Sequence, residues 1–384
     1  MDFPHLPFSA SLPQYQKQAQ DLLDAYQAAG PDAIQLIRRR LPRFMDPNVP
    51  WLPLNVPTSE IKDANLQFAD AQLTIARSYD FQDWSALSEF AAAASIPGSP
   101  VFQFESAVEA VIHGDAPALQ SLLRENPALV HARSTRRACF DPPVHRSTLL
   151  HYLAANGVEG YRQKSPPNAV EIAAILLRAG AEPDSLASLY GGECTTMALL
   201  VSSSPPAEAG VQVPLVHTLL DFGAAIEPRG VGNWTSPLMT ALVFGFTQVA
   251  EALLARGARL DNIAAAAGLG RLDKAKELLP ASDAGSRHRA LALAAQLGQA
   301  DLVALLLDAG EDPNRYNPKG FHAHATPLHH AALAGHDAAV RLLVERGARL
   351  DLQDTIYKST PLDWAQHGGH SEIADYLRRL GSTS

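Results

Sequence analysis

TPLHHAALAGHDAAVRLLVERGARLD, the stretch from Thr326 to Asp351, predicts two short antiparallel helices joined by a turn. Thr326 is a suitable N-cap, and Pro327 occupies the first helical position, where its missing N–H costs no hydrogen bond. Gly335 and Gly347 are suited to ending the two helices, because glycine adopts the left-handed backbone conformation without strain. Two such helices enclose no interior of their own. The stretch therefore predicts a repeat that is stable only when it is stacked on similar repeats.

The same pattern of a small apolar first helix, a central glycine and a second helix recurs along the chain. Counting back nine residues from each central glycine gives the start of a unit, and one further unit, at Thr196, lacks its glycine. The eight predicted units start at residues 105, 148, 196, 236, 261, 289, 326 and 360. Such recurrence specifies a fold far more strongly than a single match does.

This pattern resembles the ankyrin-repeat family, whose TPLHxAAxxG signature and repeat length of about 33 residues match residues 326–351 closely. The resemblance implies an all-α ankyrin solenoid of helix–turn–helix repeats that carry short β-hairpin fingers. It also implies that His151 and His329 form structural hydrogen bonds between adjacent repeats. Two segments, YGGECTTMALLVSSSPPAEAGVQ and GEDPNRYNPKGFHAHATPLHHAALAG, are similar to a group of bacterial ankyrin proteins with a helical N-terminal region. That likeness adds to the fold but implies no activity.

The first hundred residues differ in character from the repeats. Apolar residues recur there at helical spacing, and the segment 95–101, SIPGSPV, is typical of a linker. We therefore expect a helical N-terminal cap domain over residues 1–97 and an array of about eight ankyrin units over residues 102–382. A helix–turn–helix DNA-binding function is not favoured, because residues 1–100 hold 7 Lys and Arg against 11 Asp and Glu.

Composition argues against several classes of function. The 384 residues carry a formal net charge of −9, which does not suit a general nucleic-acid surface. Two cysteines are too few for a disulfide framework, and no apolar run approaches the roughly 18 residues that a membrane span needs. The first residues lack the cationic and apolar regions of a secretory signal. We expect a cytoplasmic, monomeric protein with no nucleic-acid or membrane partner.

Two units depart from the regular pattern through insertions between their helices. One carries VEGYRQKSPPNAVE over residues 158–171, and its neighbour carries SSSPPAEAGVQVP over residues 202–214. We expect these insertions to form a local lobe at the turn edge. The unit that starts at residue 261 leaves no residues for a finger, so the row of fingers should be interrupted in the middle of the array.

The loops between units are rich in basic and aromatic residues, although the whole chain is acidic. The aromatic residues that look exposed there include Phe321. Arginine, tyrosine and tryptophan are the residues that most often anchor protein interfaces, although about half of the loop rings are expected to pack against the next finger instead. We predict a non-enzymatic binding scaffold whose concave groove and finger loops recognise a protein segment, such as an extended acidic peptide, or a small anion. The candidate binding residues are Arg136, Arg137, Tyr190, Glu193, Trp234, Arg315, Tyr316, Lys319, His322, His324 and Tyr357.

An alternative is an enzyme or small-molecule binder that uses the groove near Tyr190, Glu193, Tyr316, His322 and His324. His322 and His324 alternate along an extended segment, a spacing that can serve a metal. No Cys, Asp or Glu completes a recognisable ligand set beside them, and the sequence contains no HExxH, GxSxG or phosphate-loop motif. We therefore expect no metal, no cofactor and no catalytic residue.

Cys139 is a further candidate for chemistry. Arg136, Arg137 and His145 lie near it in the sequence and would lower the pKa of its thiol if they surround it in space. An ordinary reduced cysteine is the simpler expectation.

Overall fold

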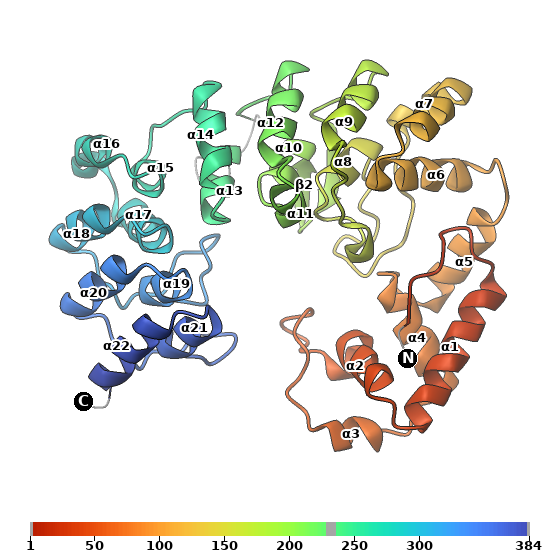
Figure 1. The fold of residues 1–384 in the computed structure, drawn as a ribbon, viewed down its shortest axis with the longest axis horizontal. Coiled ribbons are helices and arrows are strands. Elements are labelled where there is room, and N and C mark those ends of the chain that lie inside the picture. Colours follow the sequence, from red (N-terminus) through yellow and green to blue (C-terminus); the bar gives the residue numbers. More distant parts are fainter. Residues whose placement is uncertain (1–2, 228–235, 382–384) are drawn as a thin grey trace. The chain divides into compact units, whose positions relative to one another are not determined.

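The computed structural model describes residues 3–227 and 236–381 and divides the chain into two compact units, residues 1–224 and 225–384. Helices make up most of both units (Figure 1), as the all-α prediction requires. Among the described residues, the first unit contains the N-terminal helices and three helix pairs, and the second contains five helix pairs. The division thus falls inside the predicted repeat array.

The N-terminal helices pack around a hydrophobic core of their own. Tyr15, Leu22, Ile37 and Ile75 are at most 1% exposed. Pro31 separates the first two helices, because proline fits the first helical position but cannot continue a preceding helix. The elements are α1 (Leu12–Gln27), α2 (Pro31–Arg40), η1 (Pro42–Phe44), α3 (Thr58–Lys62), α4 (Phe68–Ser78) and α5 (Trp84–Ala94).

The remaining helices form pairs. The first helices of the pairs are α6 (Pro100–His113), α8 (Leu149–Leu153), α10 (Thr196–Leu200), α13 (Pro237–Val243), α15 (Ile263–Gly268), α17 (Ala284–Gln296), α19 (Pro327–Leu333) and α21 (Pro361–His367). The second helices are α7 (Ala116–Glu125), α9 (Ala169–Arg178), α12 (Gln212–Asp221), α14 (Thr247–Ala255), α16 (Leu272–Leu278), α18 (Ala300–Asp308), α20 (Asp337–Glu345) and α22 (Ser371–Gly381). Short elements between them are η2 (Pro127–His131), η3 (Gly160–Arg162), α11 (Ser204–Glu208) and η4 (Leu279–Ala281). Helix α6 begins inside the segment that was predicted to be a linker.

Among the described residues, a single loop between repeats forms a β-hairpin. Strands β1 (Leu186–Leu189) and β2 (Gly192–Thr195) pair antiparallel. Tyr190 and Gly191 form the two-residue turn with positive φ angles of 54° and 74°, as a tight hairpin requires. The fingers before α8 and α19 are irregular loops, and each contains two prolines, which lack the N–H that a strand ladder needs.

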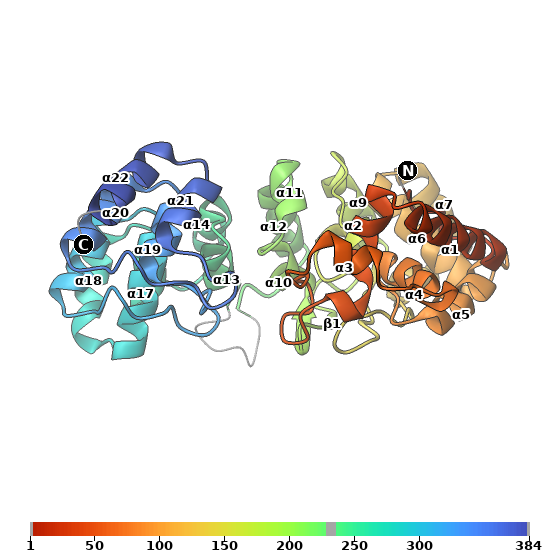
Figure 2. The same ribbon diagram turned by 90° about the horizontal axis from the view of Figure 1, so that it is seen from below.

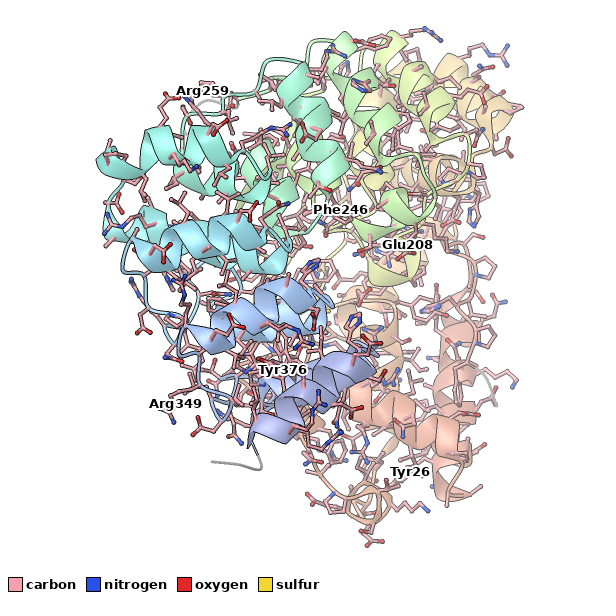
Figure 3. The ribbon with its side chains drawn as sticks, turned by 60° about the vertical axis from the view of Figure 1, so that its left-hand side comes forward. Tyr26, Glu208, Phe246, Arg259, Arg349 and Tyr376 are labelled. Carbon is pink, nitrogen blue, oxygen red and sulfur yellow. The ribbon has the colours of Figure 1, made fainter. Side chains whose placement is uncertain are left out.

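The second helices of the pairs expose a charged face. In α20, Val340 and Leu343 are 0% exposed, whereas Arg341 pairs with Asp337 at 2.7 Å. The Arg341 guanidinium also lies 4.4 Å from the ring centroid of Tyr376, a residue of the neighbouring α22 that Figure 3 labels. The apolar face of the helix is therefore buried between repeats, and the polar face is exposed to solvent.

Histidines fasten neighbouring repeats to one another. The Thr326 hydroxyl lies 2.8 Å from Nδ1 of His329, and Nε2 of His329 donates to the carbonyl of Ser359 in the next repeat at 3.2 Å. His151 makes the equivalent hydrogen bonds in the second helix pair. Both histidines thus have the structural role that the family resemblance implied.

The insertion at residues 158–171 turns inward. Glu159 and Arg162 are 0% and 1% exposed. The Tyr161 ring stacks on the His5 ring of the N-terminal segment, with 4.5 Å between the ring centroids. The expectation of a protruding lobe is therefore wrong for this insertion, which joins the N-terminal helices to the first repeats through buried contacts.

Gly335→Ala is expected to destabilise the second unit by about 1–2 kcal/mol more than Gly347→Ala. Both glycines have a positive φ, 78° and 90°, which an alanine adopts only with strain. A Cβ on Gly335 would also lie 2.5 Å from Cε1 of His370, whose Nε2 donates to Leu333, whereas nothing lies within 4 Å of a Cβ on Gly347. Urea unfolding followed by circular dichroism measures the difference. Equal losses in the two variants would contradict the crowding by His370.

Candidate functional site

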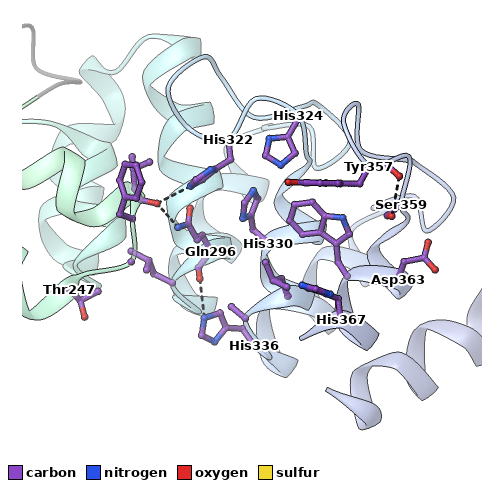
Figure 4. A pocket seen from close by; sticks show the side chains of 17 residues that line it. Thr247, Gln296, His322, His324, His330, His336, Tyr357, Ser359, Asp363 and His367 are labelled. Carbon is purple, nitrogen blue, oxygen red and sulfur yellow. Dashed lines mark hydrogen bonds between the residues drawn. The ribbon is translucent and has the colours of Figure 1, made fainter. Parts of the chain in front are cut away.

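A groove in the second unit is the candidate site (Figure 4). It encloses about 1160 Å³ and is lined by the ends of α13 and α17, by α19 and α21, and by the loops before α19 and α21. Helices α17, α19 and α21 lie side by side as the first helices of successive repeats (Figure 2). The site therefore belongs to the repeats themselves.

The groove residues on α19 and α21 lie at the same number of positions after the N-cap of each helix. After the N-cap Thr326, the groove is lined by His330 and Leu333, and Trp364 and His367 occupy the corresponding positions of α21. Positions that are three or four residues apart lie on one face of a helix. His330 and Trp364 were not among the predicted binding residues; the spacing places each on the same helix face as Leu333 or His367 but does not show whether that face lines a groove.

His322 fixes the loop before α19 against α13. Its Nε2 donates to the carbonyl of Val243 at 3.0 Å, and Nε2 of Gln296 donates to the same oxygen at 2.7 Å. His322 has a positive φ of 58°, which a residue other than glycine adopts when its surroundings hold it. The neighbouring Phe244 is 51% exposed, with its ring centroid 6.2 Å from that of His322. The groove thus presents an exposed ring beside a fixed loop.

Four rings from helices α19 and α21 and from the loops before them meet in the other half of the groove. The ring centroid of Trp364 lies 5.2 Å from His330 and 5.7 Å from His324, and His324 lies 6.2 Å from Tyr357 (Figure 4). These are distances typical of packed aromatic rings. Tyr357 is 53% exposed, whereas Trp364 is 8% exposed. An exposed ring therefore lies over a largely buried aromatic floor.

A buried carboxylate lies behind Trp364. Asp354 is 0% exposed and accepts the indole N–H of Trp364 at 3.1 Å. It also accepts the backbone N–H groups of Ile356, Tyr357 and Ser359. Burial by itself would raise the pKa of Asp354, but these four donors hold that pKa below its usual value. Asp354 is therefore ionised at neutral pH.

Three histidines of the groove are uncharged at neutral pH. Burial lowers the pKa of His330 to about 3, and the neighbouring His322, His324 and His329 lower it further. Burial also lowers the pKa of His324 and His336. The Nε2 atom of His330 has no hydrogen-bond partner within the part of the chain that the structure describes. The groove therefore offers neutral imidazoles, one of them with an unpaired ring nitrogen.

Comparison with known proteins agrees with this geometry. A family model described as ankyrin repeats (3 copies) matches residues 262–354 and 291–383. Human cyclin-dependent kinase 4 inhibitor B is 34% identical over 122 residues, which make up 31% of this chain and 86% of that protein. The chain belongs to the ankyrin-repeat family.

Other similar ankyrin proteins cover this chain in part. Human cyclin-dependent kinase inhibitor 2A is 34% identical over 122 residues, which are 31% of this chain and 76% of that protein. Mouse ankyrin repeat and SAM domain-containing protein 6 is 35% identical over 111 residues, which are 29% of this chain but only 12% of that protein. The family model covers α15 to α22, so the groove lies largely in the most regular ankyrin repeats.

The predicted binding residues of the second unit lie partly inside and partly outside the groove. Three of them line the ankyrin groove, namely His322, His324 and Tyr357. Arg315 and Lys319 are exposed on the loop before α19 but are not among the lining residues. Tyr316 is half-buried, and its hydroxyl donates to the carbonyl of Gln353 at 2.6 Å. Trp234 lies outside the described residues.

In the first unit, the predicted binding residues lie on separate elements. Tyr190 and Glu193 are exposed on the β1–β2 hairpin, and the Tyr190 hydroxyl donates to Oδ1 of Asn156 at 2.6 Å. Arg137 is exposed and pairs with Glu89 of α5 at 2.9 Å. Arg137 therefore contacts the N-terminal helices.

Two residues that were expected on the surface are buried. Arg136 is 3% exposed, and its guanidinium lies 4.3 Å and 4.5 Å from the ring centroids of Phe81 and Phe90. It pairs with the buried Glu159 at 3.1 Å. Phe321 is also 3% exposed. The expectation that Arg136 lies on a binding surface is therefore wrong, because its partners come from distant segments that enclose it.

A serine, a histidine and a carboxylate do come together in the first unit, but no substrate can reach them. Nδ1 of His145 lies 2.8 Å from the Ser147 hydroxyl, and Nε2 lies 3.2 Å from Oε1 of Glu159. All three side chains are 0% exposed, and Arg136 already occupies Glu159. Nucleophilic catalysis needs an accessible hydroxyl, so this arrangement is structural.

The structure also bears on metal, thiol and membrane chemistry. Within the described ranges, no group of three or more His, Cys, Asp and Glu is placed to hold a metal. Cys139 and Cys194 are unbridged, and burial raises the pKa of both thiols, with Asp80 raising that of Cys139 further. Neither thiol is therefore activated as a nucleophile. None of the described helices is both long and apolar enough to cross a membrane.

Proposed function

We propose that this ankyrin-repeat protein is a non-enzymatic scaffold whose groove in the second unit binds a segment of another protein. The observation that carries the proposal is the pair of exposed rings at the groove, Phe244 and Tyr357, at 51% and 53% exposure. Tyr357 lies over the floor that Trp364 and His330 help to form, and Phe244 lies beside His322 in the other half of the groove. Rigid aromatic rings over a packed floor are typical of the anchor pockets of protein interfaces, because they add contact area at little cost in conformational entropy.

The relatives support a protein partner in general terms. Two of them are named as inhibitors of cyclin-dependent kinases, that is, as proteins that act on another protein. A shared fold does not transfer a ligand, so the kind of partner must follow from the groove of this chain. We further infer a monomeric, cytoplasmic protein, on the ground of its acidic composition and its two cysteines.

The predicted preference for an acidic segment is supported by the finger loops alone. Arg315, Lys319 and Lys358 are exposed on the loops before α19 and α21 and are available to acidic residues that flank the bound core. Among the described residues that line the groove, none is Lys or Arg. We therefore assign acidic contacts to the loops and a different side chain to the groove.

The alternative, a small-molecule site, has one observation in its favour, which is the volume of the groove. Drug-sized ligands occupy clefts of roughly 300–1,000 Å³, and this groove is of that order. Of the residues named for this alternative, His322 and His324 line the groove, whereas Tyr190 and Glu193 belong to the first unit. A thermal-shift screen of metabolites tests it, since a ligand at 100 times its dissociation constant adds about 2.7 kcal/mol.

The double variant Phe244→Ala/Tyr357→Ala is expected to weaken segment binding by at least about tenfold, because it removes both exposed anchor rings. The full chain is immobilised and screened with a display library of random linear peptides. Dissociation constants of the enriched peptides are then measured for the wild type and the variant by fluorescence anisotropy.

A matched control keeps this test specific to the groove. Trp51 and Ile96 are exposed at 70% and 58% in the N-terminal region, so Trp51→Ala/Ile96→Ala removes similar apolar surface elsewhere. This control should bind the peptides as the wild type does. Peptides that bind the groove variant with unchanged affinity would contradict the proposal, and a third variant, Tyr190→Ala, would then show whether the β1–β2 hairpin is used instead.

A further inference from the structure

We propose that the bound segment anchors in the groove through a lysine or arginine side chain, a proposal that rests on the groove being the binding site. The anchor lies beside the exposed ring of Tyr357 and the imidazole of His324, next to Trp364. Its charge lies toward Asp363, which lines the same half of the groove (Figure 4).

The charges around this half of the groove favour a cation. Asp363 is exposed and is the single Asp or Glu among the described lining residues, and no Lys or Arg offsets it there. Asp354 adds a second negative charge behind the indole of Trp364, whose N–H it accepts at 3.1 Å. A carboxylate in that position makes the indole more electron-rich, and an electron-rich ring attracts a cation to its face. An acidic anchor would be repelled by both carboxylates.

The imidazoles supply hydrogen-bond acceptors. A neutral imidazole always has one ring nitrogen with a free lone pair. Within the described residues, Nε2 of His330 has no hydrogen-bond partner, and the ring of His324 lines the groove. Burial keeps the pKa of both rings below the usual value, so neither repels a cation at neutral pH. Ammonium and guanidinium groups are pure donors, and they therefore complement these acceptors where a hydrocarbon anchor does not.

The apolar part of the groove suits the rest of a basic side chain. Lysine and arginine carry an aliphatic stem that packs on apolar surface while the charged end stays near water. Leu333 and the exposed ring of Tyr357 provide such surface, and Asp363 lies at an exposed position. A purely aromatic or aliphatic anchor would fill the same volume but would leave the carboxylate without a counter-charge.

Peptides enriched on the wild-type chain test the anchor directly. Each peptide is resynthesised with its lysines replaced one at a time by norleucine and its arginines by citrulline, which keep the length of the side chain and remove the charge. We expect one replacement at a shared position to weaken binding by about tenfold. This loss should shrink as the salt concentration rises, because an exposed carboxylate is screened.

A charge placed at Tyr357 tests whether a cation occupies this part of the groove. Tyr357 is 53% exposed, so a lysine there is accommodated without burying its charge. The matched control is Ile96→Lys, which adds the same charge at a 58% exposed site in the N-terminal region and should bind as the wild type does. Tyr357→Lys places a cation where the anchor lies and should weaken basic peptides by at least about tenfold, since like charges at an interface repel. Thermal unfolding of both variants checks the fold.

The outcomes distinguish this proposal from the one on which it rests. If the norleucine or citrulline peptides bind as tightly, or the enriched peptides share no basic residue, the anchor is overturned. In that case, loss of binding by Phe244→Ala/Tyr357→Ala would leave the groove as the binding site. If no peptide depends on those two rings, or none is enriched, both proposals are overturned.

Discussion

Replacing Arg162 by methionine is expected to lower the free energy of unfolding of the first unit by about 3–5 kcal/mol. Arg162 is 1% exposed, and its guanidinium pairs with the buried Glu105 and, at 3.0 Å, with Glu109. Without it, the Glu105 carboxylate keeps the guanidinium of Arg136 at 3.5 Å but loses its closest partner. Water cannot replace that partner in a buried site, so most of the desolvation penalty remains.

Urea unfolding followed by circular dichroism measures this loss. Arg349→Met is the matched control, because Arg349 pairs with Asp351 at 2.7 Å while their side chains are 58% and 71% exposed. An exposed pair of this kind contributes little to stability. The double variant Arg162→Met/Glu105→Gln should recover part of the loss, because it removes the carboxylate charge that has lost its closest partner. A loss in Arg162→Met that is no larger than in the control would contradict the buried ionic role.

Lowering the pH from 7 to 4 is expected to destabilise the protein through its buried histidines. Burial lowers the pKa of His151 to about 4 and that of His330 to about 3, from 6.5 in the unfolded chain. The unfolded chain therefore binds protons that the folded chain does not, so stability is fully present above pH 6.5 and is lost as the pH falls. Because one pKa unit corresponds to about 1.4 kcal/mol, each histidine contributes on the order of 3 kcal/mol to the loss at pH 4.

Urea unfolding between pH 7 and pH 4 measures this dependence. His330→Leu should remove the share of His330 from the second unit and make its stability flatter between pH 6.5 and pH 4, although His329 keeps a contribution of the same sign. The groups that face His330 are His322, His324 and His329, with Trp364 against its ring. A wild-type stability that does not change over this range would contradict the prediction.

The fold was predictable because its information is local. Central glycines, N-caps and small apolar helices recur along the chain, and each indicates where a helix beside it begins or ends. Four predicted unit starts coincide with N-cap residues of first helices, namely Thr148, Ser236, Thr326 and Thr360. The β-hairpin fingers were predicted by family resemblance, and prolines account for the irregular loops before α8 and α19.

The candidate site was predictable only in part. His322, His324 and Tyr357 were found because loop residues of these types stand out against an acidic, alanine-rich chain. Trp364 and Phe244 were missed, because a large apolar residue on a first helix has the same local pattern whether it faces the core or the groove. Only the packing of neighbouring repeats decides whether such a residue faces the core or the groove.

The burial of ion pairs could not be predicted from the residues next to them in the sequence either. Arg136 has the sequence context of an exposed loop arginine, yet Glu105 and Glu159 enclose it from separate segments. Charge is normally evidence of exposure, and it misleads where an insertion brings in opposite charges from elsewhere in the chain.

The hydrogen bond from His322 to Val243 has a consequence for how the second unit comes apart. In a simple solenoid each repeat touches its two neighbours, so the repeats can peel away one after another from an end. His322 precedes α19, whereas Val243 ends α13, so this bond spans the repeats of α15 and α17. These repeats are therefore expected to unfold together with α13 and the loop before α19 rather than one after another. The groove wall formed by α13 and this loop should stay in register until that whole block opens.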